Sequence, residues 1–361
     1  HSFPTRRSSD LIYIRLHQHS WMEEDAHLNN IWNALYSGVS SANRVLYQFE
    51  NSTIEMNGKE NYIAELKVAR AFYYYLLLEA FGNVPIIDRF DVPDGYLPAT
   101  EPRSKVFEFV ESELKNNINN LSEDVLNTYG RFNKWNAKML LARLYLNAEA
   151  WIGTPMYNEC ENLCNEIIAT NKYRLDGDYS LPFSTNNELS NETMFVIPFD
   201  ETKSGGQIYM WARKTLHYSQ MQTFNLQATW LDGGCVGVPT FFDNYIEGDK
   251  RLEKTWRMGQ QYALDGTPLW TNGWCGDPQM LLSYTKDVTN ISGDATMYQG
   301  YRFGKYEIKI GATGTPDNDY VIMRYAEVLM MKAECILRTG GSSQEAAELV
   351  NEVRRRNFRS E

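Results

Sequence analysis

The stretch Ala71–Leu78, with the sequence AFYYYLLL, is the longest apolar run in this chain of 361 residues. It lies inside a predicted helix over 61–81, which Gly82 and Pro85 bring to an end. Because the run is apolar on nearly every side of a helix, we expect neighbours to bury it on several sides. It is also far shorter than the ~18 residues that a membrane-spanning helix needs. The run therefore predicts a large helical core.

Helical periodicity extends outward from this stretch in both directions. Apolar residues recur every three or four positions before residue 175, which predicts helices over 26–49, 61–81, 104–121, 135–151 and 155–170. Ser104 is expected to cap the third of these. The same periodicity returns over 320–338 and from 343 onward. Antiparallel pairs with Ala and Tyr at the contact positions are similar to tetratricopeptide repeats, although no fixed period holds.

The pattern changes between Leu175 and Asp319. Turns rich in glycine and aromatic residues appear there, as at Asp232–Gly234 and Thr271–Trp274, and the alternation in Tyr306–Ile310 predicts a strand. A long, irregular insertion on a rigid frame usually carries the functional residues. The sequence thus predicts a helical frame that is interrupted once by a binding region.

These observations predict a mainly α fold, in which a tetratricopeptide-like scaffold of helix pairs carries a loop-rich insertion with short strands. We expect the scaffold over 12–174, the ligand-binding insertion over 175–319 and the returning scaffold over 320–361, truncated at its C-terminal end. Residues 1–11 lack both periodicity and the apolar segment of a signal peptide. We expect them to be a leader that is foreign to the fold.

Composition narrows the choice of partner. Acidic residues outnumber basic ones by 46 to 35, which gives a net charge of −11 and argues against nucleic acid as the ligand. Aromatic residues make up 13% of the chain. Many will be core, but Trp and Tyr also suit surfaces that stack flat, apolar ligand faces.

Motifs for catalysis or for metal binding are missing from the sequence. It contains no G-x-G-x-x-G after a strand, no Walker A motif, no H-E-x-x-H and no G-x-S-x-G. Cys160 and Cys164 share one helical stripe without a nearby His, so we expect core residues rather than zinc ligands. We therefore expect no catalytic residue, no cofactor and no metal. Two other classes stay open, a tetratricopeptide-like adaptor for proteins and a glycoside hydrolase with two carboxylates about 5–10 Å apart.

One stretch strongly resembles a known family. Asp317–Glu334, with the sequence DNDYVIMRYAEVLMMKAE, together with Gly340 and Asn351–Arg354, is similar to the SusD/RagB family. Shorter motifs in the same order extend the resemblance to nearly everything after residue 20: Trp32–Tyr36, Ala69–Pro85, Trp135–Arg143, Phe183–Ile197 and Asp249–Arg251.

The resemblance implies a non-catalytic lipoprotein on the surface of the outer membrane of glycan-degrading bacteria. Such a protein binds an oligosaccharide and sits as a lid on a TonB-dependent, SusC-like transporter. It touches the membrane only through a lipid anchor, which is expected on a segment that precedes residue 1.

Within the family, the chain looks closest to the fructan-binding branch, and this resemblance implies four ligand-binding residues. Trp21 would be a stacking platform, and Cys235 would line the pocket where neighbouring glycines let the backbone approach the ligand. Arg302 would donate a fork of hydrogen bonds to sugar hydroxyls, and Tyr325 would add a ring and a hydroxyl.

Each of these residues also has a structural alternative. Trp21 is alternatively a staple under the first helix, and Cys235 a small turn residue. Arg302 is alternatively an ion-pair partner and Tyr325 a core residue. Trp270 and Trp274 are further stacking candidates, with a loop anchor as their alternative.

Overall fold

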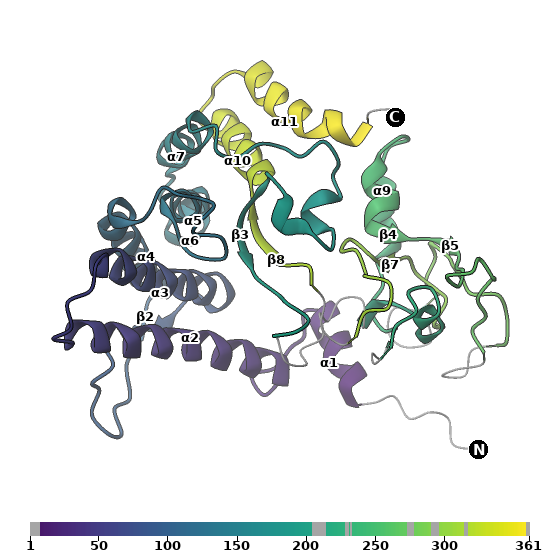
Figure 1. The fold of residues 1–361 in the computed structure, drawn as a ribbon, viewed down its shortest axis with the longest axis horizontal. Helices are drawn as coiled ribbons and strands as arrows, with labels where there is room; N and C mark the ends of the chain where they lie inside the picture. Colours follow the sequence, from purple (N-terminus) through teal and green to yellow (C-terminus); the bar gives the residue numbers. More distant parts are fainter. Residues whose placement is uncertain are drawn as a thin grey trace.

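The computed structural model describes residues 8–203, 214–227, 231, 233–272, 278–289, 296–313 and 317–358, with side chains from Tyr13 onward. Most of the helices gather on one side of the molecule, and a loop-rich region with short strands lies on the other (Figure 1). The helices are α1 (Ser8–His17), α2 (Ala26–Glu50), α3 (Lys59–Phe81), α4 (Arg103–Asn117), α5 (Lys134–Leu146), α6 (Ala148–Ile152), α7 (Tyr157–Ala169), α9 (Lys250–Thr255), α10 (Tyr325–Arg338) and α11 (Ser343–Phe358).

The scaffold is a row of helices that pack on their neighbours. Contacts join α2 to α3, α3 to α4, α5 to α7, α7 to α10 and α10 to α11. Helix α10 thus packs on α7 across the whole insertion that separates them in the sequence. The predicted fold class, a helical-pair scaffold with a loop-rich insertion, is confirmed.

The apolar run Ala71–Leu78 lies at the centre of the helical core, as its sequence predicts. Tyr74, Leu77 and Leu78 are fully buried, and Phe72 packs against Phe195 from the insertion. Burial of this many large side chains stabilises the fold by roughly 1.5–3 kcal/mol for each. The core therefore ties the insertion to the scaffold.

Short antiparallel strand pairs organise the rest: β1 (Val84–Pro85) with β2 (Thr100–Glu101), β3 (Thr193–Ile197) with β8 (Tyr320–Arg324), β4 (Trp256–Arg257) with β7 (Arg302–Phe303), and β5 (Gly259–Gln260) with β6 (Ser283–Tyr284). The β3–β8 pair runs along the helical side and leads directly into α10 (Figure 1). It joins the two ends of the insertion.

Two predicted elements are wrong, and the physical reasons are local. The periodicity predicts a helix over Tyr320–Arg324, but this segment forms β8, because its Tyr, Val and Ile favour a strand and β3 supplies a partner. The alternation predicts a strand over Tyr306–Ile310, but this segment is irregular. Its polar groups are satisfied otherwise: the Tyr306 hydroxyl accepts from the Val321 N–H at 3.1 Å, and the Glu307 N–H donates to the Phe183 carbonyl at 2.9 Å.

Helix boundaries also shift. Pro102, not Ser104, occupies the position before α4, and the Asn83 side chain accepts from the Arg103 N–H at 2.8 Å. Proline fits this extended position because its ring fixes φ near −65°, the value that Pro102 has. The fourth predicted helix divides at Asn147 into α5 and α6. Helix α1 begins at Ser8, so helical structure extends into the predicted leader over 1–11.

Candidate functional site

Cys235 and Arg302 come together in the loop-rich region. Arg302 is fully buried and donates to the carbonyl oxygens of Gly233 at 3.1 Å, of Gln299 at 3.1 Å and of Met297. Burial raises the pKa of the Cys235 thiol, while the Arg302 charge opposes that shift. Because the guanidinium serves backbone carbonyls, this geometry favours a structural role in which Arg302 holds the Cys235 loop in place.

Gly233 makes this loop possible. Its φ is +64°, and a Cβ at this position would lie 2.2 Å from the Met297 side chain. Only glycine adopts this backbone conformation without strain and also leaves the space free. Asp232, from the same turn, lies outside the described residues.

Trp21 and Trp270 are exposed, whereas Tyr325 is not. Trp21 lies in the turn between α1 and α2, is 48% exposed, and tilts against His19 with ring centres 5.5 Å apart. Trp270 is 47% exposed, and its carbonyl accepts from the Ser219 hydroxyl at 2.7 Å. Tyr325 begins α10 inside the helical core, and burial raises its pKa. Trp274 lies outside the described residues.

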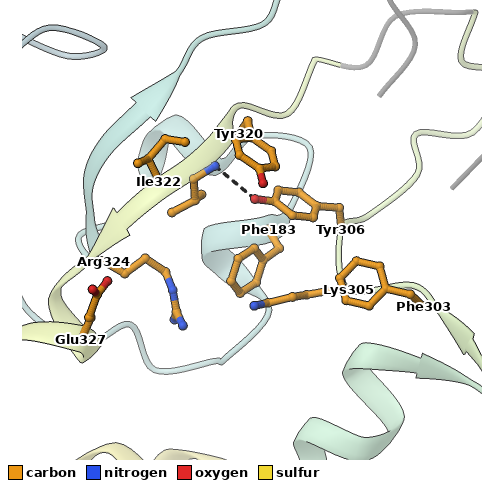
Figure 2. A pocket seen from close by; sticks show the side chains of 9 residues that line it. Phe183, Phe303, Lys305, Tyr306, Tyr320, Ile322, Arg324 and Glu327 are labelled. Atoms are coloured by element: carbon orange, nitrogen blue, oxygen red, sulfur yellow. Dashed lines mark hydrogen bonds between the residues drawn. The ribbon is translucent and has the colours of Figure 1, made fainter. Parts of the chain in front are cut away.

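A cavity of ≈ 230 Å³ opens between the insertion and the first turn of α10, and sequence reasoning missed it. Figure 2 shows its aromatic wall and the two cationic side chains, Lys305 and Arg324, that point into it. The residues that line it are Phe183, Phe303, Lys305, Tyr306, Tyr320, Val321, Ile322, Arg324 and Glu327. Phe303 and Lys305 follow Arg302, and Arg324 precedes Tyr325, so the predicted residues flank the cavity in sequence.

The cations of this cavity lie on aromatic faces. The Lys305 ammonium lies 4.1 Å from the centre of the Phe183 ring, and the Arg324 guanidinium lies 5.1 Å from the same ring. Burial, assisted by the Arg324 charge, lowers the pKa of Lys305 to about 8. Ring faces attract cations, but they do not neutralise them.

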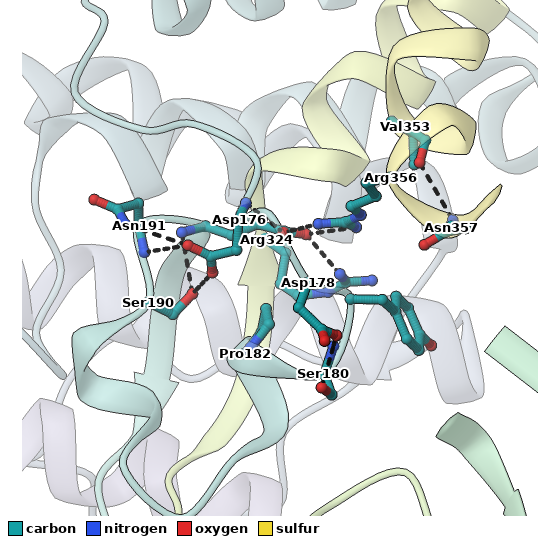
Figure 3. Close-up of polar contacts among 12 residues, drawn as sticks. Asp176, Asp178, Ser180, Pro182, Ser190, Asn191, Arg324, Val353, Arg356 and Asn357 are labelled. Atoms are coloured by element: carbon teal, nitrogen blue, oxygen red, sulfur yellow. Dashed lines mark hydrogen bonds and ion pairs between the residues drawn. The ribbon is translucent and has the colours of Figure 1, made fainter. Parts of the chain in front are cut away.

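Arg324 is held by a buried carboxylate. Glu192 is inaccessible to solvent, and it accepts from Arg324 Nη1 at 2.6 Å and from both Nη atoms of Arg356 on α11. Figure 3 shows Arg324 and Arg356 among the polar contacts of this region. The Glu192 carbonyl also accepts from the Tyr325 N–H at 2.8 Å. The network therefore fixes the start of β3, the end of β8 and the last helix against one another, and it aims Arg324 at the cavity.

An open groove of ≈ 730 Å³ lies beyond the other end of β8. Four carboxylates and one lysine carry its charge, and the full lining is Tyr129, Thr185, Asn186, Glu188, Pro198, Phe199, Asp200, Lys203, Asp317 and Asp319. Asp319 accepts from the Phe199 N–H at 2.8 Å and from the Tyr129 hydroxyl. Hydrogen bonds from Thr202 lower the pKa of Asp200 to about 2, and those from Lys309 lower that of Asp317. The groove is an acceptor-rich surface that suits hydroxyl donors.

The described residues offer neither a metal centre nor a membrane span. Within those ranges, no group of three or more His, Cys, Asp and Glu side chains is arranged to hold a metal ion. Cys160, Cys164 and Cys335 are instead buried together between α7 and α10. No described helix is both long enough and apolar enough to cross a bilayer.

A row of packed helices with a loop-rich face, a cavity and an open groove defines a mainly helical scaffold protein with a loop-rich insertion. Residues 5–146 match the model of a family described as starch-binding and associating with the outer membrane, and residues 165–360 match the SusD family model. The chain belongs to the SusD family.

Sequence similarity to individual SusD proteins supports this assignment. The chain is 24% identical to the starch-binding protein SusD of Bacteroides thetaiotaomicron over 93% of its own length. The match covers 65% of that relative, so the chain spans just under two thirds of it. A SusD-like protein of Bacteroides ovatus is 32% identical over 35% of this chain and 24% of its own length.

Solved structures share the fold. A SusD superfamily protein from Parabacteroides distasonis superposes with a TM-score of 0.75 at 20% identity, over 97% of this chain and 72% of that one. Surface glycan-binding protein A from Bacteroides thetaiotaomicron, in complex with laminarihexaose, gives the same TM-score at 20% identity, over 98% and 73%. At such identities the likeness concerns the fold.

Proposed function

We propose that this protein binds an oligosaccharide or polysaccharide at its loop-rich face without cleaving it. It would do so at the cell surface, held to the outer membrane by a lipid anchor, and would deliver the glycan to a TonB-dependent, SusC-like transporter. Fructan is one ligand class to test, because the sequence around Trp21, Cys235, Arg302 and Tyr325 resembles that branch of the family, although Arg302 and Tyr325 are buried in the structure.

The observation that carries this proposal is the exposure of Trp21 and Trp270 in a member of the SusD family. Tryptophan is highly buried on average, so two half-exposed indoles offer large flat apolar surfaces on which a ligand can stack. Sugar rings present flat C–H faces that stack on such a surface. The relative with laminarihexaose bound has the same fold, which supports a glycan as that partner.

Two of the four carboxylates of the groove, Asp200 and Asp317, support binding over hydrolysis. A glycosidase needs one carboxylic acid whose pKa is raised so that it can protonate the leaving group. The pKa values of Asp200 and Asp317 are instead lowered, and Asp317 accepts from the Glu201 N–H at 3.0 Å. Ionised carboxylates held in this way can accept hydrogen bonds from sugar hydroxyls.

The test is native affinity electrophoresis in gels that contain levan, inulin, starch, xylan or pectin. We expect retardation in at least one gel and its loss in Trp21→Ala. Tyr47→Ala is the matched control, because Tyr47 is 41% exposed but lies on α2, where it packs against Phe90 with ring centres 5.8 Å apart. The control should migrate like the wild type in every gel.

The outcomes separate the open classes. Retardation by levan or inulin that Trp21→Ala abolishes supports fructan as the ligand. Retardation by another glycan supports a glycan-binding protein but rejects fructan as its ligand. A folded protein that no glycan retards contradicts the proposal and favours the tetratricopeptide-like adaptor. Shortened oligosaccharide products after incubation would instead favour a glycoside hydrolase.

A further inference from the structure

The cavity beside α10 has more positive charge than its carboxylates can neutralise. Glu327 is already paired with Arg143, whose Nε and Nη2 lie 2.5 and 2.6 Å from its two oxygens. Glu192 is shared between Arg324 and Arg356. Among the described residues, no carboxylate oxygen lies within 4.0 Å of the Lys305 ammonium. Within that part of the chain, the lysine is therefore a partly buried cation without a counter-ion.

An uncompensated cation of this kind is costly in a protein with a net charge of −11. Removal of an ammonium from water destabilises the folded state unless an anion pairs with it. The Lys305 ammonium lies over the Phe183 ring and 5.8 Å from the Tyr179 ring centre, and neither ring supplies a negative charge. Glu192 partly opposes the lowering of the Lys305 pKa, but Arg324 and Arg356 already share its carboxylate. Such an arrangement is expected where a ligand completes the pairing.

We propose that this cavity binds a negatively charged residue of the glycan ligand, one that carries a carboxylate or a sulfate ester. The inference rests on the glycan-binding function proposed above and adds the charge class of the ligand. Lys305 and the free edge of the Arg324 guanidinium would hold the anionic group, while Tyr306 and Tyr320 would contact the sugar ring.

The geometry suits one sugar residue. The cationic ends of Lys305 and Arg324 point into the same space below Phe183 (Figure 2). The Tyr306 and Tyr320 rings stack at 6.1 Å with an interplanar angle of 9° and form one side of the cavity. The volume of ≈ 230 Å³ is below the ~300–1,000 Å³ typical of sites for drug-sized ligands, so a single residue would fill it.

The acidic groove makes the inference more specific. An anionic sugar would be repelled by the groove, where four carboxylates outnumber the paired Lys203 and Lys309. The difference in charge between the two hollows would therefore orient an acidic glycan with its anionic residue at Lys305. A neutral fructan has no group for this cavity and would leave it unused. The two ligand classes are therefore separable by experiment.

The experiment is isothermal titration of the full chain with tetragalacturonate, with its methyl ester and with a sulfated carrageenan oligosaccharide. The methyl ester keeps the sugar and removes the charge. The test variant is Lys305→Met, and its matched control is Lys309→Met. Lys309 stands four residues away, and Glu201 at 2.8 Å and Asp317 at 2.7 Å neutralise its ammonium. Both variants lose one positive charge, so only the position differs.

We expect an anionic oligosaccharide to bind at least tenfold more tightly than the methyl ester. Lys305→Met should weaken this binding about tenfold or more, as the loss of a charge-assisted partner does, and Lys309→Met should leave it unchanged. Tighter binding of tetragalacturonate assigns a carboxylate, and tighter binding of the carrageenan fragment assigns a sulfate ester.

Three results would overturn the inference in ways that can be told apart. Binding of neutral glycans alone rejects the charged ligand but keeps the proposed function. Equal effects of Lys305→Met and Lys309→Met reject the cavity as the place where the anion binds. A protein that binds no glycan at all, by titration or in the affinity gels, contradicts both proposals together.

The pH dependence of binding gives an independent measurement. The groups that face Lys305 from the packed elements are Arg324, Glu192, Glu327 and the rings of Tyr179, Phe183, Tyr306 and Tyr320. An anion that binds protonated Lys305 raises its pKa, so affinity is complete below the pKa of the free protein. Affinity for the anionic oligosaccharide should fall as pH rises from 7 to 9, and affinity in Lys305→Met should not.

Discussion

The two hollows at the ends of β8 differ in charge although one strand separates them. At one end, Arg324 and Lys305 face an aromatic cavity whose carboxylates already pair with other arginines. At the other end, Asp317 and Asp319 face an open groove in which backbone N–H groups, Tyr129 and Lys309 satisfy their oxygens. A protein with an overall excess of acid thus presents two surfaces of opposite sign.

Lys305 and Lys309 show that the surrounding fold decides the difference in charge between the two hollows. They stand four residues apart on the same irregular segment. Lys305 is turned inward over Phe183, and burial lowers its pKa, whereas Lys309 is exposed between two carboxylates, which raise its pKa. Both lysines belong to one short segment of one acidic chain, so the surrounding fold sets the character of each site.

The largest effect is expected at the carboxylate that holds the cationic cavity together. Glu192→Gln leaves the buried guanidinium of Arg356 and that of Arg324 without their shared counter-ion. Removal of one partner from a buried ion pair costs roughly 3–5 kcal/mol. Urea denaturation should show a loss of at least about 3 kcal/mol in the free energy of unfolding. A loss below about 1 kcal/mol would mean that the network does not hold α11 to the strand pair.

A substitution in the acidic groove should cost less stability than Glu192→Gln, because each groove carboxylate keeps another hydrogen-bond donor. Tyr129→Phe removes the hydroxyl that donates to Asp319 while the Phe199 N–H at 2.8 Å remains. A hydrogen bond to a charged group contributes about 1.5–3 kcal/mol when buried, and Tyr129 is 37% exposed. We expect a loss of about 1–2 kcal/mol by urea denaturation. Tyr13→Phe, at a ring that packs on His27, is the control and should be neutral.

Lys305→Met should change stability in the opposite direction and raise the free energy of unfolding of the free protein. Replacement of a poorly compensated cation by an apolar side chain of similar length gains about 1–2 kcal/mol at pH 7. The gain depends on pH because the folded-state pKa of Lys305, about 8, lies below the unfolded value near 10.5. Between these values the unfolded wild type binds more protons, so its stability rises relative to the variant.

This relation is checked by denaturation of both proteins from pH 7 to pH 10.5. The stability difference should narrow steadily over that range. A difference that stays constant, or a variant that is less stable than the wild type at pH 7, would contradict the description of Lys305 as an uncompensated cation.

The sequence predicted the scaffold because its signals are local. The run Ala71–Leu78 and the periodic stripes identify helices without any knowledge of their partners. Pairing across the insertion is not local, and this is why the periodicity predicts a helix where Tyr320–Arg324 forms a strand. The strand conformation depends on β3, which lies far earlier in the chain.

The candidate site was less accessible to sequence reasoning for the same reason. The fructan resemblance pointed to Arg302 and Tyr325, which flank the cavity in sequence, but it did not point to the side chains that face inward. The sequence offered only a weak signal, a lysine next to Tyr306 in an insertion rich in aromatic residues, where a cation can lie on a ring face. Its meaning depends on Phe183 and Arg324, which only the fold brings to it.

The smallest effect, and the one that tests the comparison most directly, is expected for Lys309→Met. Lys309 forms two ion pairs, with Glu201 and Asp317, but its side chain is 41% exposed and solvent screens both. We expect a loss of stability close to the resolution of urea denaturation, reduced further when salt is added. Lys305→Met and Lys309→Met would then change stability in opposite directions for the same change in charge. If both variants shift stability in the same direction, total charge governs the response, and the distinction between the two hollows fails.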